Sequence, residues 1–457
     1  MVFSSLVFLF IFLPAVLIAY YSVGEKQTNI RNYILLIFSL IFYFYGEPKL
    51  IVLLLISLGI NYLIGLLMDN KYKKIFLVLA IFLNIANLLY FKYMNFFIDN
   101  INVLFNASIN YKKIIMPIGI SFYTFQALSY VIDCYRNPKL IQKNPLFVFL
   151  YVIMFPQLIA GPIVRYEDVA NQIVSREHSI EKFSYGINRF IQGLAKKVLL
   201  ANVFALMANE IFAKSASSTN SSLLWFGAIA YTLQIYYDFS GYSDMAIGLG
   251  KFFGFDFLEN FNYPYISKSI TEFWRRWHIS LSTWFRDYVY IPLGGNRKGY
   301  GRQILNIFIV WLLTGFWHGA AWNFIMWGLY FAVILIFEKI FLLDYLNKSK
   351  IIGHLYALIL IIIGWIIFRS ESLEQIFNYI KVMYSFNGGI DKQLVYYFYQ
   401  YKFNIILGLI FIFPVFKKVK KNATTEILHT VILAILFGLV VMSLAQNSYN
   451  PFIYFRF

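Results

Sequence analysis

The chain has 457 residues, of which 60% are hydrophobic, 21% are aromatic and only 13% are charged. Water-soluble domains carry about twice that charged fraction, so the composition excludes an ordinary soluble domain and indicates an integral membrane protein. The net charge of +17 comes mostly from basic residues in short loops between apolar spans, which the positive-inside rule explains without a nucleic acid partner. Cys134 is the single cysteine, so no disulfide forms within the chain.

Long apolar stretches recur along the chain and favour helices over an outer-membrane barrel. The first stretch lacks a charged start and a clear cleavage site, so we expect a retained helix rather than a removable signal peptide. We predict an all-α, polytopic membrane helical bundle in one integral-membrane domain, 1–457, with about 11–13 membrane segments plus re-entrant or interfacial helices. The candidate spans are 3–21, 30–46, 50–68, 75–92, 114–131, 146–164, 186–210, 223–246, 303–317, 320–342, 352–368, 402–416 and 427–446.

Basic clusters between the spans predict how the chain is oriented in the cell membrane. We expect the clusters within 71–74, 297–302 and 417–421 to face the cytoplasm. The last cluster precedes one final span, which places the short C-terminal tail on the outer side. The polar stretch Lys214–Ser222 predicts a flexible loop and is the best candidate for a boundary within the membrane domain.

Two carboxylates lie within the otherwise apolar span 223–246. Asp238 and Asp244 are costly at that depth unless they are paired or hydrated. Their partners could be arginines of the aromatic segment that follows, or a histidine whose tautomer one carboxylate fixes. Structural pairing is the role that we favour for both.

The stretch 261–301 is too polar to cross lipid simply. Ser269 begins a helical pattern with Glu272 three positions later, which is the spacing of a capping box. Large apolar residues then recur at helical intervals and predict one aromatic face: Trp274, Trp277, Leu281, Trp284 and Phe285. We expect this helix to lie in the membrane interface or to dip in from the cytoplasmic side. The simpler alternative is an interfacial anchor alone, because tryptophan is enriched there.

His278 lies on this segment among basic residues. A neutral imidazole there could take a proton from a hydroxyl or thiol that attacks an acyl group. Four basic residues could bind the phosphates of a charged donor: Arg275, Arg276, Arg297 and Lys298. Gly294 and Gly295 would let backbone N–H groups approach those phosphates. An ordinary positive-inside loop explains the same residues equally well.

The apolar span 304–337 contains no Asp, Glu, Lys or Arg, and His318 is its one histidine. The span is too long for one ordinary crossing, and Gly315 and Gly319 bracket the histidine, so we predict two membrane segments or one broken helix meeting at His318. An ionisable group at that depth is a functional hypothesis by default, with a structural histidine as the alternative. We find no metal-ligand spacing, no G-x-S-x-G elbow and no Walker A motif.

The chain ends in a short aromatic tail, Pro451–Phe457. Such a tail is typical of the interfacial belt that closes a last membrane helix, and its composition alone favours that interpretation. The hydroxyl of Tyr454 could instead accept an acyl group if the tail reached a cavity, as a covalent relay.

Five blocks of the sequence carry a family resemblance. They are PIGISFYTFQALSYVIDCYR (Pro117–Arg136), FPQLIAGPIVRY (Phe155–Tyr166), YDFSGYSDMAIGLGKFFGF (Tyr237–Phe255), NFNYPYISKSITEFWRRWHISLSTWFRDYVYIPLGG (Asn260–Gly295) and LTGFWHGAAWNFIMWG (Leu313–Gly328). Together they resemble the membrane-bound O-acyltransferases, MBOAT proteins, in the branch of the alginate O-acetyltransferase membrane subunit. The resemblance implies an MBOAT core at about 113–345, followed by the aromatic tail 447–457.

The resemblance also implies roles for residues. His318 matches the intramembrane catalytic histidine of the family, and His278 matches its second characteristic histidine. The family places a funnel at the thin centre of a ring of tilted helices. The tail resembles a C-terminal acyl-transfer motif, which would make Tyr454 a transient acyl carrier.

The function implied is transfer of acetyl from cytoplasmic acetyl-CoA across the membrane, for O-acetylation of an extracytoplasmic polysaccharide. The implied partner is an extracytoplasmic SGNH-type acyltransferase or esterase that passes the acyl group to the polymer. One alternative is transfer of D-alanyl or another acyl group to teichoic acid from an acyl carrier protein. Another is a transporter or flippase without covalent chemistry, although we see only one broken span where transporters usually show paired ones.

Overall fold

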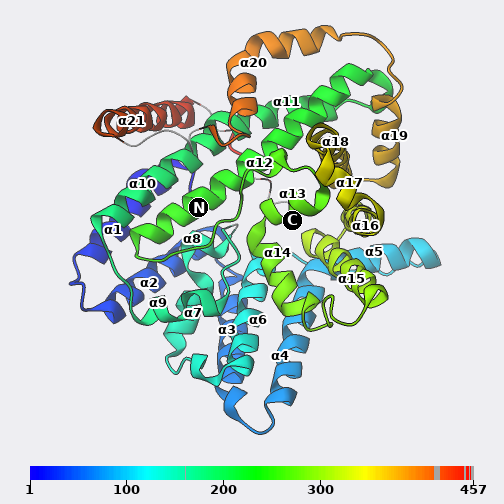
Figure 1. The fold of residues 1–457 in the computed structure, drawn as a ribbon. Coiled ribbons are helices and arrows are strands. Elements are labelled where there is room, and N and C mark those ends of the chain that lie inside the picture. The colour runs from blue at the N-terminus through cyan, green and yellow to red at the C-terminus, as the bar shows by residue number, and fades with distance from the viewer. Residues whose placement is uncertain (160, 416–421, 447–448, 452, 454–457) are drawn as a thin grey trace. The chain divides into compact units, whose positions relative to one another are not determined.

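The computed structural model describes the whole chain except residues 160, 416–421, 447–448, 452 and 454–457, and the side chains of Ser217 and Asn347. Every regular element among the described residues is helical, and none is a strand (Figure 1). The chain forms two compact units: residues 1–190 with 243–258 make unit 1, and residues 191–242 with those from 259 onward make unit 2. The all-α prediction is therefore confirmed.

Unit 1 is built from the N-terminal helices. They are α1 (Leu13–Tyr21), α2 (Thr28–Gly46), α3 (Ile51–Leu66), α4 (Lys73–Leu88), α5 (Met94–Phe105), α6 (Ile120–Arg136), α7 (Pro145–Ile153), α8 (Phe155–Leu158), α9 (Tyr166–Val174) and most of α10 (Ile180–Ala195). Helices α3 and α4 pack along α6, as Figure 1 shows. An aromatic cluster fills the interior elsewhere, where Phe8, Phe42 and Phe155 contact one another.

Unit 2 carries the helices that follow α10, and α12 continues from unit 2 into unit 1. They are α11 (Asn202–Phe212), α12 (Ser221–Phe252), α13 (Ile270–Arg276), α14 (Ile279–Phe285), α15 (Tyr300–His318), α16 (Trp322–Phe337), α17 (Leu343–Lys348), α18 (Lys350–Arg369), α19 (Leu373–Met383), α20 (Lys392–Ile410) and α21 (Ala423–Gln446). The polar stretch Lys214–Ser222 lies wholly within unit 2, so it is not the boundary between the two units.

Short π-helical and 3-10 turns extend many of these helices. The π-helical turns are η1 (Phe8–Phe12), η3 (Leu89–Tyr93), η5 (Lys196–Ala201), η8 (Arg286–Tyr290) and η9 (Glu338–Leu342). The 3-10 turns are η2 (Leu67–Asp69), η4 (Pro138–Leu140), η6 (Ala216–Ser218) and η7 (Pro264–Ile266). π-helical turns are rare and are often found at functional sites. Here η5 carries Lys197 and η9 carries Glu338.

Six helical stretches among the described residues are long and apolar enough to cross a membrane: 51–69, 73–105, 180–212, 322–346, 350–369 and 423–446. They agree with the predicted multi-pass membrane bundle. The expected span 146–164 is wrong, because α7 ends at Ile153 and α8 is four residues long. Pro156 lacks the amide hydrogen that would continue α7, and Met154 turns to an extended conformation. Nine helical residues cover roughly 14 Å, about half of a bilayer core.

Helices α15 and α16 form a close antiparallel pair, and the break between them falls at His318 as predicted (Figure 1). Gly315 and Gly328 lie where the two backbones meet. A Cβ on Gly315 would stand 2.6 Å from the carbonyl oxygen of Phe324, and one on Gly328 would stand 2.5 Å from that of Trp311. Only glycine allows this approach, which is how small residues act at helix interfaces in membranes.

The substitution Gly315→Ala should therefore lower the stability of the folded protein. We expect a loss of about 1–3 kcal/mol, because a methyl group at this contact must push the two helices apart. The measurement is the thermal unfolding midpoint of the detergent-solubilised protein. Gly59→Ala on α3 is the matched control, because a Cβ there meets nothing within 4 Å. Equal midpoints for the two variants would contradict the proposed contact.

The aromatic segment differs from the sequence-based expectation. It forms two short helices, α13 and α14, broken at His278, and the five residues of the predicted aromatic face are each less than 10% exposed. Trp274 packs against Trp311, Trp327 and Phe331, with ring centroids 4.6, 5.5 and 5.0 Å away. The expected single helix is therefore wrong, because a break at His278 divides it into two, and neighbouring protein helices cover its aromatic face.

One hydroxyl group and one carboxylate group fix the start of α13. The hydroxyl of Ser269 accepts a hydrogen bond from the backbone N–H of Glu272 at 3.0 Å, which confirms the predicted N-cap. Glu338, a fully buried residue in η9, accepts hydrogen bonds from the backbone N–H groups of Ile270 and Thr271 at 2.6 and 2.8 Å. A buried carboxylate at a helix N-terminus satisfies donors that have no partner within the helix. Glu338 thus holds the segment that carries His278.

Candidate functional site

His318 is the last residue of α15 and lies among aromatic rings. Its imidazole packs edge-on against Trp327 and Phe368, with ring centroids 4.9 and 5.1 Å away, and against Trp317 at 4.8 Å. The residue is only 5% exposed. Asn323 at the start of α16 donates a hydrogen bond to the carbonyl of Phe368 at 3.0 Å, which ties the end of α18 to this enclosure. The imidazole is therefore held rigidly in surroundings that exclude bulk water.

His278 joins α13 to α14 in a left-handed conformation, with φ of +46°. A non-glycine residue rarely adopts this conformation, and such residues cluster at active sites. The side chain is 1% exposed, and burial lowers the pKa of His278 to about 3. The imidazole is therefore neutral at physiological pH, because desolvation disfavours the charged form.

The hydrogen bonds of His278 fix which ring nitrogen carries the proton. Nδ1 lies 3.1 Å from Oδ1 of Asn260, and the same oxygen accepts from the N–H and the hydroxyl of Ser280 at 3.2 and 2.9 Å. Because Oδ1 is an acceptor, Nδ1 of His278 must carry the hydrogen and Nε2 keeps its lone pair. Among the described residues Nε2 has no hydrogen-bond partner. Nε2 therefore keeps a lone pair that can accept a hydrogen bond, but the lowered pKa makes this imidazole a weak base.

The structure brings the two histidines to one aromatic cluster, although they are 40 positions apart in the sequence. The ring of Trp317 lies 5.9 Å from that of His278 and 4.8 Å from that of His318. Phe239 on α12 packs edge-on against His278 at 4.6 Å. The sequence does not predict Trp317, Phe239 or Asn260 as residues of the site. Only Trp317 could have been suspected, because it directly precedes His318 in the sequence.

The four basic residues proposed to bind donor phosphates lie in two places. Arg275 is exposed at the end of α13, whereas Arg276 pairs with Glu272 at 2.9 Å and donates to the carbonyl of Asn262. Arg297 and Lys298 are exposed in the turn before α15. Among the described residues no hydrogen bond or ion pair joins the two places. Arg276 is thus already held by Glu272 and Asn262, whereas the other three basic side chains are exposed.

Gly294 and Gly295 have φ values of +107° and +54° in that same turn. Their carbonyls lie in a tight bend, where Asn306 donates a hydrogen bond to the carbonyl of Gly295 at 2.9 Å. Gly295 N–H in turn donates to the carbonyl of Tyr290 at 2.9 Å. The backbone of this turn is therefore satisfied largely by the protein itself, and its N–H groups form a weaker phosphate site than the arginines.

The two carboxylates of α12 have cationic partners from the helical stretch 180–212. Asp238 pairs with Lys197 of η5 at 2.5 Å, and both side chains are less than 5% exposed. Asp244 pairs with Arg189 of α10 at 2.8 Å. Neither partner is an arginine of the aromatic segment or a histidine, contrary to the two possibilities raised from the sequence. Both cationic partners are brought to the carboxylates by the packing of helices and are distant from them in the sequence.

A comparison of the sequence with models of known protein families shows which family the chain belongs to. The model of the membrane-bound O-acyltransferase family, MBOAT, matches residues 3–369. The chain belongs to this family. It is therefore a multi-pass membrane O-acyltransferase, and both histidines and the aromatic cluster lie within the matched residues. The family gives no support to the transporter or flippase considered from the sequence.

Curated relatives of this acyltransferase share its enzyme class. The probable alginate O-acetylase AlgI of Pseudomonas putida is 40% identical over 491 aligned positions, which cover 100% of both chains. The peptidoglycan O-acetyltransferase of Helicobacter pylori is 34% identical and covers 85% of this chain and 80% of its own. The teichoic acid D-alanyltransferase of Bacillus subtilis is 33% identical over 50% of this chain and 61% of its own.

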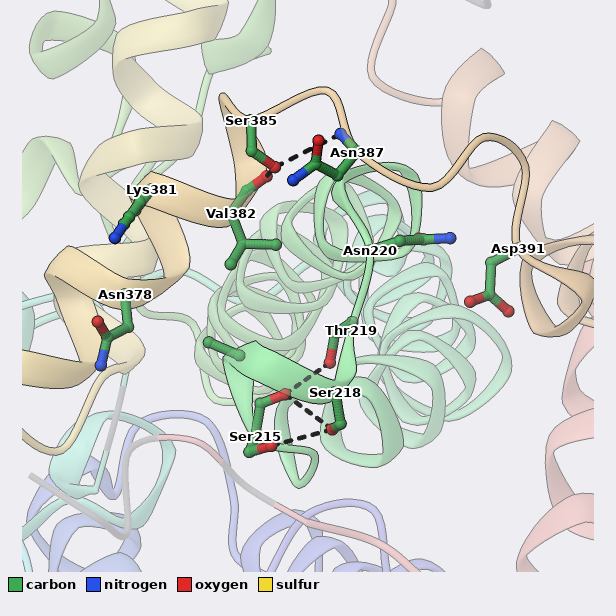
Figure 2. A pocket seen from close by; sticks show the side chains of 11 residues that line it. Ser215, Ser218, Thr219, Asn220, Asn378, Lys381, Val382, Ser385, Asn387 and Asp391 are labelled. Atoms are coloured by element: carbon green, nitrogen blue, oxygen red, sulfur yellow. Dashed lines mark hydrogen bonds between the residues drawn. The ribbon is translucent and has the colours of Figure 1, made fainter.

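A hollow of about 710 Å³ lies on unit 2 of the acyltransferase, and none of the predicted site residues is among those that line it (Figure 2). The loop that includes Ser215, Thr219 and Asn220 forms one wall, and Asn387 and Asp391 lie across from it. The hydroxyl groups of Ser218 and Thr219 donate to the carbonyl of Ser215 at 3.0 and 2.8 Å. The residues that line this hollow include no histidine or cysteine.

Tyr454 lies outside the described residues, so its predicted role remains a proposal. The described tail residues begin at Tyr449, whose hydroxyl accepts a hydrogen bond from Asn209 at 2.6 Å. Ile453, directly before Tyr454 in the sequence, is 8% exposed and belongs to the hydrophobic core of unit 2. The described part of the tail is therefore packed into the protein and is not a free end.

Within the described residues no group of three or more His, Cys, Asp or Glu side chains is arranged to hold a metal ion. The residues of the site are imidazole, indole, phenyl and amide groups. Their chemistry is that of proton transfer in an apolar enclosure.

Proposed function

We propose that this membrane O-acyltransferase moves an acetyl group from cytoplasmic acetyl-CoA across the cell membrane, for O-acetylation of an extracytoplasmic polysaccharide. The observation that carries the proposal is the contact of His278 and His318 with the one indole ring of Trp317. It joins two imidazoles in a single enclosure. The relatives named as alginate and peptidoglycan O-acetyltransferases support acetyl as the acyl group and a polysaccharide as its destination.

The reaction is transfer of an acyl group from sulfur to oxygen. The accepting hydroxyl oxygen attacks the thioester carbonyl carbon, and His318 takes the hydroxyl proton as the C–O bond forms. The C–S bond then breaks, and the proton passes to the departing thiolate of CoA. His278 assists through Nε2, either as a proton shuttle or by orienting the donor, because Asn260 holds its Nδ1–H.

The donor enters from the cytoplasmic face in this proposal. Arg275, Arg297 and Lys298 lie in segments that the positive-inside rule places at that face, and their exposed cations are suited to the phosphates of CoA. Arg276 contributes only if the donor displaces its pairing with Glu272. No metal takes part. The same rule places the C-terminal tail on the outer side.

The acyl group leaves through the tail and a partner. Tyr454 is the proposed relay: its phenolic oxygen carries the acetyl group as an ester between donor and final acceptor. An extracytoplasmic SGNH-type acyltransferase or esterase then passes the acetyl group to the polysaccharide. This chain supplies the membrane half of the transfer, and membrane lipid surrounds its helices.

The donor is tested by offering two candidates separately to membranes that contain the protein. Labelled acetyl-CoA should load acetyl onto the protein or the polymer, whereas a D-alanyl-charged carrier protein should load nothing. The relative from Bacillus subtilis, a teichoic acid D-alanyltransferase, makes D-alanyl transfer the second candidate. Membranes without the protein give the background. Loading from the charged carrier alone would replace acetyl-CoA with the D-alanyl alternative.

A further inference from the structure

The described residues of the C-terminal tail are held by a series of polar contacts within unit 2. The carbonyl of Pro451 accepts a hydrogen bond from Nζ of Lys197, and the backbone N–H of Ile453 donates to Oδ2 of Asp238 at 2.9 Å. Next to them, Asn202 donates through its side chain to Asn450 at 3.3 Å. The contacts to residues 451 and 453 are made to the backbone, so they fix the path of the tail whatever side chains it carries.

Lys197 and Asp238 are themselves a buried ion pair. Their charged atoms lie 2.5 Å apart, and the side chains are 3% and 2% exposed. Nζ of Lys197 also donates hydrogen bonds to the amide oxygen of Asn202 at 3.0 Å and to the carbonyl of Pro451. Each member of the ion pair therefore makes a hydrogen bond to the backbone of the tail.

The fold brings the pair together at a close crossing of two helices. A Cβ on Gly241 of α12 would stand 2.7 Å from the carbonyl oxygen of Gly193 and 3.1 Å from the backbone nitrogen of Lys197. Gly241 follows Asp238 by three positions, so both residues share one face of α12. The π-helical turn η5 then directs Lys197 toward that face. The sequence places glycine where the two backbones must meet.

A buried ion pair is not explained by stability alone. Removing two charges from water costs as much as their attraction returns, and apolar residues of similar size often stabilise a protein equally well. The feature of this pair that stability does not account for is its contact with the tail backbone. On α12, Asp238 holds the tail, and the next residue, Phe239, packs edge-on against His278 at 4.6 Å. One helix thus links the anchored tail to the histidine cluster.

We propose that Lys197 and Asp238 form a clamp that holds the C-terminal tail against α12 by the backbone of residues 451 and 453, and that acyl transfer depends on this hold. Both are positioning residues. The consequence for transfer rests on the proposed function, in which Tyr454 carries the acetyl group. The clamp itself does not depend on that chemistry, so the two can fail separately.

The test uses the full-length protein with one reporter cysteine in the tail. Cys134 is the only natural cysteine, so Cys134→Ala with Ile453→Cys leaves a single thiol at a buried position. A membrane-impermeant maleimide should label this thiol slowly while the clamp is intact. Adding Lys197→Met and Asp238→Leu together should speed labelling by at least about 10-fold, because the tail is released without leaving an unpaired charge.

The matched control replaces the second ion pair on α12 with the same residues, by Arg189→Met and Asp244→Leu, and should leave the labelling rate unchanged. Gel filtration of each variant checks that it remains folded. Fast labelling with an intact clamp, or no acceleration when the clamp is removed, overturns the proposal. Acceleration with normal polymer acetylation would sustain the clamp and overturn the relay through the tail. Acceleration with lost acetylation supports both.

Discussion

Replacing His318 with alanine should reduce acetyl transfer by about 10³-fold, because the hydroxyl that attacks the donor would have no base to receive its proton. The imidazole is enclosed by Trp317, Trp327 and Phe368, so water has little room to substitute for it. The measurement is the rate of CoA thiol release, together with acetyl incorporated into polymer. His318→Gln keeps more of the side-chain volume and should fail to the same degree.

The control for this experiment is a histidine outside the cluster. His429 lies on an exposed part of α21, and His429→Ala should transfer acetyl at the normal rate. His278→Ala should retain more activity than His318→Ala, since His278 assists rather than accepts the first proton in the proposed mechanism. A folded His318→Ala protein with unchanged acetylation would refute the assignment of the base.

The second large effect is expected at the tail. Tyr454→Phe removes one oxygen atom and keeps the aromatic ring, so polymer acetylation should fall by about 100-fold if the phenolic ester is an obligatory intermediate. Mass spectrometry of the C-terminal peptide after incubation with acetyl-CoA should find acetyl on the normal tail and none on the variant.

An exposed tyrosine elsewhere provides the comparison for this variant. Tyr345 is 70% exposed near the end of α17, and Tyr345→Phe should leave acetylation unchanged. An unmodified tail in an enzyme that still acetylates the polymer would point to direct transfer from donor to acceptor. His318 would then activate the final hydroxyl itself, and the clamp would have only a structural purpose.

The sequence predicted local features well, because local rules govern them. The break at His318 follows from flanking glycines that end α15 and let it meet α16. The N-cap at Ser269 follows from a hydroxyl three positions before a free N–H group. The predicted span 146–164 is wrong for a reason that is also local, because Pro156 cannot continue α7.

The surroundings of each polar group could not be predicted in this way. A periodic aromatic face such as that of α13 and α14 shows that something apolar covers it, but lipid chains and protein helices are equally apolar. Nothing adjacent in the sequence indicates that Glu338 caps α13 or that Asn260 sets the tautomer of His278. These contacts join residues 18 to 68 positions apart.

By itself the sequence determined that the chain is a helical membrane protein and that two histidines stand out within it, because composition and motif spacing are properties of neighbouring residues. The tertiary structure alone decided that these histidines share the ring of Trp317. It also decided that Lys197, rather than an arginine of the aromatic segment, pairs with Asp238. The physical reason is that partners across helices depend on where backbones cross closely, as at Gly241, and on which buried charges must be neutralised there.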